Sequence, residues 1–252
     1  MALLEIRKLS KYFGGLTVLK EIDFSVERGE ILGLIGPNGA GKSTLFNIIV
    51  GVHPPTSGHI IFEGKDITGF RPSQVAKRGI IKTYQANVSF RDLTVIENIL
   101  IGHHLQVRAS GLGVFFNSLK AREDKKRIEA DTSGILEFFD LAQKERELAG
   151  ELPHGYQRLL GIATAAAAKP KLLLLDEPVT GMNTVEASLM VDAIRKLRNS
   201  GVTIVIVEHD MNVVMNLCDR IVVLHFGNKI AEGPPGAIRQ NKEVIETYLG
   251  AG

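Results

Sequence analysis

The sequence predicts an α/β fold with a mostly parallel sheet, an antiparallel β part near the N-terminus and an inserted helical block. Apolar strand-like runs alternate with helical patterns in the C-terminal third, as they do where crossover helices join parallel strands. A glycine-rich loop at residues 36–44 lies between a strand pattern and a helix pattern. Residues 172–175 are all leucine, which is typical of a strand buried on both faces.

The N-terminal third is predicted to form strands separated by turns. Alternating or continuous apolar residues predict strands over 3–7, 18–26, 31–35 and 59–62, with glycine-bearing turns between them. A helix follows the glycine-rich loop at 44–50. A short helix over 73–77 and a strand over 80–84 end this part.

From residue 94 the apolar pattern becomes helical. It predicts helices over 94–106 and 120–139, with a glycine-bearing loop over 108–117 between them. A further helix is predicted over 157–168. Because no strand pattern occurs from about residue 87 to 155, this block is predicted to be a helical insertion.

The remaining residues alternate between strands and helices. The predicted elements are strands over 172–175, 202–207 and 220–225, helices over 185–198, 211–217 and 242–249, and a hairpin turn at 227–229.

Composition excludes some classes of protein. With 252 residues, 44% hydrophobic, the chain can bury a core, and a net charge of +2 is too small to argue for nucleic acid as a partner. The single cysteine, Cys218, excludes an internal disulfide and favours a reducing compartment. Its apolar helical neighbours favour a thiol packed in the core over a reactive one.

Neither a secretory leader nor a membrane span is expected. Glu5 and Lys8 introduce charge before an apolar segment can form at the N-terminus. The longest stretch without charged residues, 43–62, is interrupted by Pro54 and Pro55. We therefore expect a cytoplasmic chain that meets a membrane only through a partner.

The glycine-rich loop fits the pattern G-x-x-x-x-G-K-[ST]. Its members are Gly36, Pro37, Asn38, Gly39, Ala40, Gly41, Lys42, Ser43 and Thr44. Glycines let backbone N–H groups converge on a phosphate chain, and the following helix N-terminus adds partial positive charge. Lys42 is predicted to reach the β- and γ-phosphates of a nucleotide and Ser43 to bind Mg²⁺. The alternative is a glycine-rich turn that matches by chance.

Three further polar residues follow buried strand patterns. Asp176 and Glu177 come directly after the leucine strand, and His209 follows the next strand along the chain. Asp176 is suited to the Mg²⁺ shell, and Glu177 to polarising a water aimed at the γ-phosphorus. His209 can touch a γ-phosphate. The alternatives are acidic residues that merely end a strand and a surface or capping histidine.

The order of these motifs resembles that of ATP-binding-cassette (ABC) ATPases, a class of P-loop NTPase, over essentially the whole chain. The resemblance implies that the chain binds and hydrolyses ATP with Mg²⁺. It identifies Gln85 with the glutamine that senses Mg²⁺ and couples to the partner subunit, Glu177 with the catalytic base and His209 with the switch histidine. Phe13, or less closely Tyr12, resembles the aromatic residue on which adenine stacks. An ordinary strand-end aromatic is the alternative for both.

The resemblance also implies a domain organisation. Residues 1–252 are expected to form a single ABC ATPase domain, with a nucleotide-binding core over 1–86 and 156–252. A helical subdomain over 87–155 carries the family's signature segment at its end.

In that family the LSGGQ signature of a second subunit completes each ATP site. Leu152 and Gly155 match the signature, whereas Pro153 replaces the serine that would meet the γ-phosphate, His154 replaces a glycine and Tyr156 replaces the glutamine. Proline also lacks an N–H. We therefore expect the site completed by this segment to be the weaker one. ATP on this chain's own P-loop is expected to be hydrolysed better, provided that the partner's signature is intact.

The opening residues 9–16, the extended helical block and the tail over 230–250 resemble the ATPase subunits of bacterial branched-chain (hydrophobic) amino acid uptake systems. Asn183, where many ABC ATPases have aspartate, fits that subfamily. The resemblance implies a sister ATPase as partner, with a homodimer as the alternative, and two membrane permeases with an external substrate-binding protein. The chain would then be peripheral on the inner face of the cell membrane. Relatives of this type also carry urea, short amides or aromatic acids.

Three questions stay open from the sequence. The loop over 107–119 is either a solvated loop or a contact with the permease. A non-transport ABC ATPase, such as those of iron–sulfur cluster assembly or DNA repair, is the second functional hypothesis. A nucleotide clamp that hydrolyses ATP poorly is the third, because of Pro153 and His154.

Overall fold

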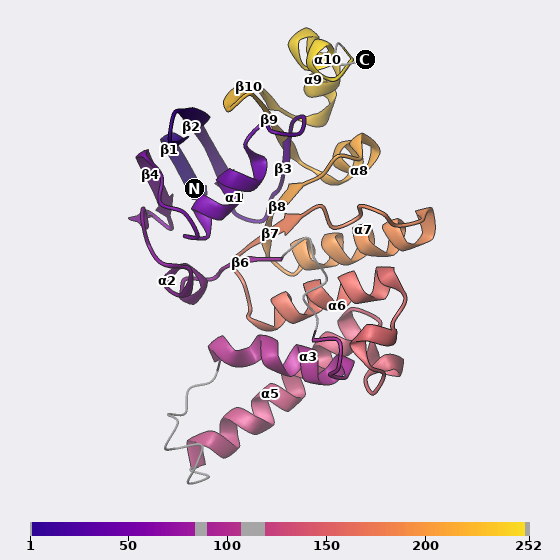
Figure 1. Ribbon diagram of the computed structural model, residues 1–252. Helices are drawn as coiled ribbons and strands as arrows, with labels where there is room; N and C mark the ends of the chain where they lie inside the picture. Colours follow the sequence, from indigo (N-terminus) through magenta and orange to yellow (C-terminus); the bar gives the residue numbers. More distant parts are fainter. Residues whose placement is uncertain (1, 84–89, 107–118, 250–252) are drawn as a thin grey trace. The chain divides into compact units, whose positions relative to one another are not determined.

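The computed structural model describes residues 2–83, 90–106 and 119–249 (Figure 1). These residues form two compact units. Unit 1 comprises residues 1–85, 171–181 and 194–252, and unit 2 comprises residues 86–170 and 182–193. Unit 2 therefore takes in residues 156–170 and 182–193 in addition to the helical block anticipated from the sequence.

Unit 1 contains two sheets. Their strands are β1 (Ala2–Phe13), β2 (Leu16–Glu27), β3 (Ile31–Ile35), β4 (Ser57–Phe62), β5 (Lys65–Asp66), β6 (Ile80–Lys82), β7 (Leu172–Asp176), β8 (Thr203–Val207), β9 (Arg220–His225) and β10 (Asn228–Gly233). The first sheet is antiparallel, in the order β2-β1-β4-β5. The second has the order β10-β9-β3-β8-β7-β6 and is parallel except for β10. The predicted α/β fold with an antiparallel N-terminal part is confirmed.

The helices divide between the units. They are α1 (Lys42–Ile49), α2 (Pro72–Lys77), α3 (Val95–Gly102), α5 (Leu119–Phe138), α6 (His154–Ala167), α7 (Thr184–Asn199), α8 (Met211–Leu217), α9 (Pro235–Gln240) and α10 (Lys242–Leu249), with short 3₁₀ turns at His103–Gln106, Ala142–Lys144 and Ala149–Glu151. In unit 2, α3, α5 and α6 pack on one another (Figure 1).

The first two strands are longer than predicted. β1 and β2 pair antiparallel from end to end, but their register shifts at several points. Lys8 and Glu21 have φ values of 45° and 44°, so each departs from extended geometry within its strand. These irregularities break the apolar alternation on which a sequence-based strand prediction depends. The predicted strands at 3–7 and 18–26 were therefore too short.

The predicted start of α6 at residue 157 was wrong. The helix begins at His154, and Pro153 is its N-cap. The carbonyl of Pro153 accepts a hydrogen bond from Gln157 N at 3.0 Å, so the helical pattern is established from that residue. Proline is tolerated here because an N–H at a helix start has no intrahelical acceptor. The signature-like residues 153–155 thus belong to the first turn of a helix.

The core of unit 1 surrounds α1. Phe46 from α1 and Phe62 from β4 are almost fully buried among side chains of both sheets. Burial of a side chain of this size stabilises the fold by about 1.5–3 kcal/mol. Cys218 is buried as expected, and burial raises the pKa of its thiol to about 12. The prediction of a thiol packed in the core is confirmed.

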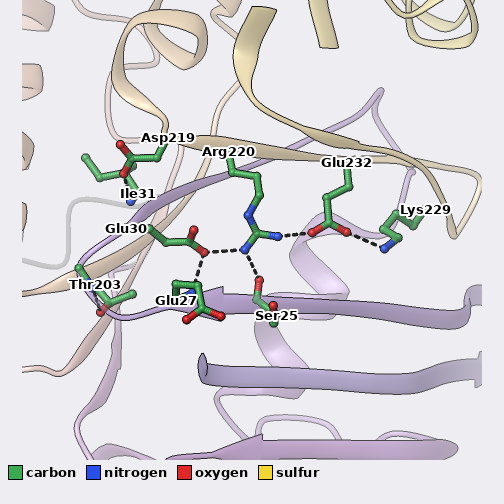
Figure 2. Close-up of polar contacts among 10 residues, drawn as sticks. Ser25, Glu27, Glu30, Ile31, Thr203, Asp219, Arg220, Lys229 and Glu232 are labelled. Carbon is green, nitrogen blue, oxygen red and sulfur yellow. Dashed lines mark hydrogen bonds and ion pairs between the residues drawn. The ribbon is translucent and has the colours of Figure 1, made fainter. Parts of the chain in front are cut away.

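Arg220, at the start of β9, joins the ends of several strands (Figure 2). Its guanidinium donates to Glu30 Oε1 at 2.7 Å, to the carbonyl of Ser25 at 2.6 Å and to the carboxylate of Glu232 in β10. The neighbouring Asp219 accepts from Ile31 N at 2.9 Å. The turn between β2 and β3 and the hairpin partner β10 are therefore tied to one cation.

His103 in unit 2 is a buried histidine, 1% exposed, and within the described residues neither of its ring nitrogens has a hydrogen-bond partner. Burial lowers its pKa below the ordinary 6.5, with the charges of Lys169 and Arg127 acting in the same direction and that of Asp131 opposing them. Between the folded and unfolded pKa values the unfolded chain binds more protons. The contribution of neutral His103 to the free energy of unfolding is therefore fully present above about pH 6.5. It is lost as the pH falls from there through the pKa of His103 in the folded chain.

We expect acidification from about pH 7.5 to 5.5 to destabilise the protein more than its His103→Asn variant, because the variant lacks the group that must stay neutral. Urea unfolding at the two pH values measures the difference. His104→Asn is the matched control, since His104 is exposed. Equal pH dependence of the His103 variant and the unmodified chain would contradict the expectation.

Candidate functional site

The loop over 36–41 connects β3, whose five residues are all buried, to α1. Close packing explains two of its glycines. A Cβ at Gly36 would lie 2.2 Å from the carbonyl oxygen of Leu224, and one at Gly41 would lie 2.6 Å from Leu19 Cδ2. Gly41 also has φ +103°, which L side chains rarely adopt. The loop can therefore hold this shape only with glycine at both places.

Lys42 lies inside the loop that precedes it. It is 6% exposed, and its Nζ donates to the carbonyl oxygens of Gly36 at 2.6 Å and Pro37 at 3.0 Å. Burial lowers the pKa of Lys42, whereas the negative charges of Glu177 and Asp176 raise it. The structure thus brings this ammonium into the electrostatic reach of both predicted acidic residues.

Asp176 ends β7 and forms a buried ion pair that the sequence analysis did not find. Its Oδ2 lies 3.1 Å from Nζ of Lys82 at the end of β6, and these side chains are 9% and 6% exposed. Lys82 also donates to Asn47 Oδ1 at 3.1 Å. β6 and β7 are parallel neighbours, which brings the two strand ends to the same edge. One oxygen of Asp176 is therefore held by a cation of this chain.

Glu177 and His209 meet at the same edge of the sheet. His209 Nε2 lies 2.6 Å from Glu177 Oε1, with side chains 40% and 15% exposed. Glu177 adopts φ 51°, and its amide donates to the carbonyl of Val207 at 2.8 Å. A left-handed residue at a strand end is a strained conformation that fixes the direction of its side chain. The carboxylate and the imidazole are thus positioned together and remain accessible to solvent.

Glu208, between β8 and His209, is 1% exposed and was assigned no role from the sequence. Its Oε1 accepts from Val179 N at 2.8 Å and its Oε2 from His209 N at 3.0 Å. Burial raises its pKa, and the backbone hydrogen bonds oppose that shift. This side chain joins the segment after Glu177 to the segment that carries His209. In the sequence, the only sign of this role was a charged residue directly after a buried strand pattern.

The signature-like segment lies in unit 2. Gly155, in the first turn of α6, donates its amide hydrogen to Glu186 Oε1 at 3.1 Å. Glu186 belongs to α7, and its Oε2 accepts from Asn183 N at 3.1 Å. Pro153 offers no side-chain acceptor to the helix N-terminus. Nothing in the sequence pattern pointed to Glu186.

A sequence profile described as "ABC transporter" matches residues 19–180, a stretch that contains the loop, the signature-like segment and the Asp176–Glu177 strand end. The chain belongs to the ABC transporter family of ATPases. A second profile, described as "Branched-chain amino acid ATP-binding cassette transporter", matches residues 228–252.

Individual relatives are similar along their full length. The ABC ATPase is 38% identical to the high-affinity branched-chain amino acid transport ATP-binding protein LivG of Escherichia coli (strain K12), and 36% identical to BraF of Pseudomonas aeruginosa, each over 98% of both chains. Among solved structures, an ATP-binding cassette of an ABC transporter in its ADP conformation is 33% identical, with a TM-score of 0.85 over 99% of both chains. The predicted family, fold and ATP-hydrolysing activity are confirmed, and the nucleotide is its ligand class.

The other predicted site residues of the ABC ATPase lie in different parts of the chain. Phe13 and Tyr12 are each 43% exposed, and the ring of Phe13 contacts His53 edge-on, with 5.6 Å between centroids. Gln85 lies outside the described residues, as does the loop over 107–118. Gly155 belongs to unit 2, whereas the loop, Asp176, Glu177 and His209 belong to unit 1.

In residues 2–83, 90–106 and 119–249, no group of three or more His, Cys, Asp or Glu side chains is arranged to hold a metal ion. None of the helices in these ranges combines the length and the apolarity needed to cross a bilayer.

Proposed function

We propose that this ATPase is the motor subunit of a bacterial importer for branched-chain or other hydrophobic amino acids. The main support for this substrate class is the similarity to LivG and BraF over 98% of the chain. The match of residues 228–252 to the branched-chain amino acid transporter profile supports it as well. Related small organic solutes are the alternative cargo, because an ATPase subunit does not itself contact the solute.

In this proposal the loop residues 36–44 bind the triphosphate through backbone N–H groups. Two observations support this role: the N-cap of α1 is a glycine, which has no side chain to cap the helix N-terminus, and the position of a Cβ at Gly39 is open space. Lys42 exchanges its contacts with the Gly36 and Pro37 carbonyls for the β- and γ-phosphates. The adenine stacks on the exposed Phe13, with Tyr12 as the alternative.

Hydrolysis is assigned to the pair of Glu177 and His209. Glu177 polarises a water and accepts its proton as the oxygen attacks the γ-phosphorus, while the bond from that phosphorus to the β–γ bridging oxygen breaks and ADP leaves with the electron pair. His209, 2.6 Å from the carboxylate, orients Glu177 and contacts the γ-phosphate. The buried Glu208 holds the backbone of both segments, which supports a fixed geometry for the pair.

Mg²⁺ is proposed to be held by Ser43, Asp176 and Gln85. Bound with the nucleotide, it would neutralise charge that develops on the phosphate oxygens. The sparse protein ligand set fits this ion, since Mg²⁺ usually takes one or two carboxylates and completes its shell with phosphates and water. The ion pair with Lys82 is made through Oδ2 of Asp176, at 3.1 Å.

A second ATPase subunit is proposed to complete each nucleotide site. Gly155 at the start of α6 would contact the ATP bound by the partner's loop, and the partner's signature would contact the ATP on this chain. A sister ATPase is the favoured partner and a second copy the alternative. Two permease subunits would hold the pair on the inner face of the membrane, with a substrate-binding protein outside.

The domain organisation is part of the same proposal. Residues 1–252 act as one ABC ATPase domain, with the nucleotide-binding core over 1–86 and 156–252 and the helical subdomain over 87–155. The departures at Pro153 and His154 favour a second candidate function, a nucleotide clamp that binds ATP but hydrolyses it slowly. The accessible Glu177–His209 pair favours hydrolysis.

Lys42→Ala tests the nucleotide site. We expect the variant to bind ATP about 10- to 100-fold more weakly, because a charged donor to the phosphates is lost. Fluorescence titration with a labelled ATP analogue measures the affinity. Lys77→Ala removes the same charge from an exposed helix position and should bind normally. Unchanged affinity of Lys42→Ala would remove the loop from the mechanism.

The substrate class needs a separate measurement. Cells that lack this chain are expected to lose uptake of labelled leucine, and the unmodified chain but not Lys42→Ala should restore it. Normal leucine uptake in cells without the chain would contradict the proposed cargo and leave the ATPase assignment intact.

A further inference from the structure

The carboxylate of Glu186 binds two amides from different segments of unit 2. Oε1 accepts from Gly155 N and Oε2 from Asn183 N, both at 3.1 Å. The side chain lies directly against Gly155, because a Cβ at that glycine would be 2.8 Å from both Cγ and Oε1 of Glu186. An anion of this chain therefore already occupies the amide of Gly155.

The Gly155 amide is one of the first-turn N–H groups of α6, which lack intrahelical acceptors. The same property would let it donate to a phosphate of the partner's ATP. A phosphate oxygen at this amide would lie beside the Glu186 carboxylate and be repelled by it. The hollow that contains both residues is otherwise lined largely by apolar side chains, among them Leu159, Leu189 and Met190, which leaves the repulsion poorly screened.

Helix capping explains only one of the two bonds. Asn183 Oδ1 accepts from Val185 N and Glu186 N, each at 3.0 Å, and Glu186 Oε2 returns a bond to Asn183 N. This is a reciprocal capping box at the start of α7, in which glutamine serves as well as glutamate. The bond from Gly155 to Oε1 adds nothing to that cap. The charge of Glu186 can therefore be removed while the cap stays.

We propose that Glu186 is a latch on the signature segment. In the unpaired chain its carboxylate takes the place of the partner's phosphate at Gly155, and it must swing away before the signature can engage the second ATP. This inference rests on the proposed role of Gly155 in a paired ATPase.

The test compares Glu186→Gln with glutamate at this position, both in the full chain carrying Glu177→Gln to suppress hydrolysis. Self-association with Mg·ATP is measured by sedimentation velocity as a function of ATP concentration. We expect the Glu186→Gln chain to pair at about fivefold or more lower ATP concentration. Added salt should reduce the difference, because it screens the repulsion. A purely structural role of Glu186 predicts instead a lower melting temperature and no gain in pairing.

Asp192→Asn in the same background is the matched control, because it removes one negative charge from an exposed position of α7. It should leave pairing unchanged. Equal self-association of the Glu186→Gln chain and the chain that keeps Glu186, including none in either, overturns the latch. Absence of ATP binding by the unmodified chain, measured separately by fluorescence, would count against the proposed nucleotide site and not against the charge effect itself.

Discussion

Replacing Glu177 with glutamine is expected to slow ATP hydrolysis by about 10²–10⁴-fold, the range that a positioned general base contributes. Glutamate and glutamine have the same shape. A glutamine at position 177 can therefore still form a hydrogen bond with Nε2 of His209, which lies 2.6 Å from Oε1 of Glu177. An amide cannot accept the proton of the attacking water. The loop and Lys42 are unaltered, so ATP binding should persist.

Two measurements check this result: steady-state phosphate release for hydrolysis and fluorescence titration for binding. Glu147→Gln is the control, because Glu147 is an exposed carboxylate whose ion pair with Lys144 belongs to unit 2. It should hydrolyse ATP at the unmodified rate. If Glu177→Gln did the same, the base would have to be another residue.

Replacing Pro153 with serine is expected to raise turnover at the site that this segment completes. One preorganised donor to developing negative charge is worth about 10²–10³-fold in rate, which sets the ceiling of the gain. The substitution requires no change in backbone, because Pro153 has φ −53° and ψ 150°, values open to serine at a helix N-cap. A new cap on α6 should also stabilise the chain by about 1 kcal/mol.

Pro234→Ser is a matched control, since Pro234 is likewise an N-cap without a side-chain bond, at the start of α9. Pro234→Ser should gain stability from a new helix cap but show no increase in turnover. The comparison uses phosphate release by the assembled transporter and urea unfolding of the isolated chain. A stabilised Pro153→Ser variant with unchanged or slower turnover would mean that the serine hydroxyl is not what limits this site, and would shift attention to His154.

The sequence was sufficient for the elements whose signal is local. The loop over 36–44, the leucine strand and the strand before His209 each combine an apolar run with an adjacent polar motif. Both strands were placed correctly, whereas the helix predicted to start at residue 44 begins at Lys42, so the last residues of the motif belong to α1. α9 was missed although Pro234 and Pro235 are a helix-start signal, because six residues give too short a pattern. No range was predicted for β10, the strand that follows the predicted hairpin turn, because its apolar and polar residues do not alternate.

The contacts that complete the site were beyond the sequence. Lys82 meets Asp176 only because β6 lies beside β7 in the sheet, an order that no local pattern specifies. Glu208 and Val179 are 29 positions apart, and Gly155 and Glu186 are 31 apart. Such pairings depend on packing between elements, so a local sequence motif indicates the candidate site residue and not the residue that holds it.

Arg220, at the start of β9, also holds the edge strand of the second sheet in place. β10 is the terminal strand of its sheet and the antiparallel cover of β9. Its Glu232 is fastened to Arg220. A chain cut before residue 228 would leave β9 with a free row of backbone donors and acceptors, which is the kind of surface that recruits strands from other molecules. Because Arg220 holds Glu232, β9 keeps a pairing partner within its own chain.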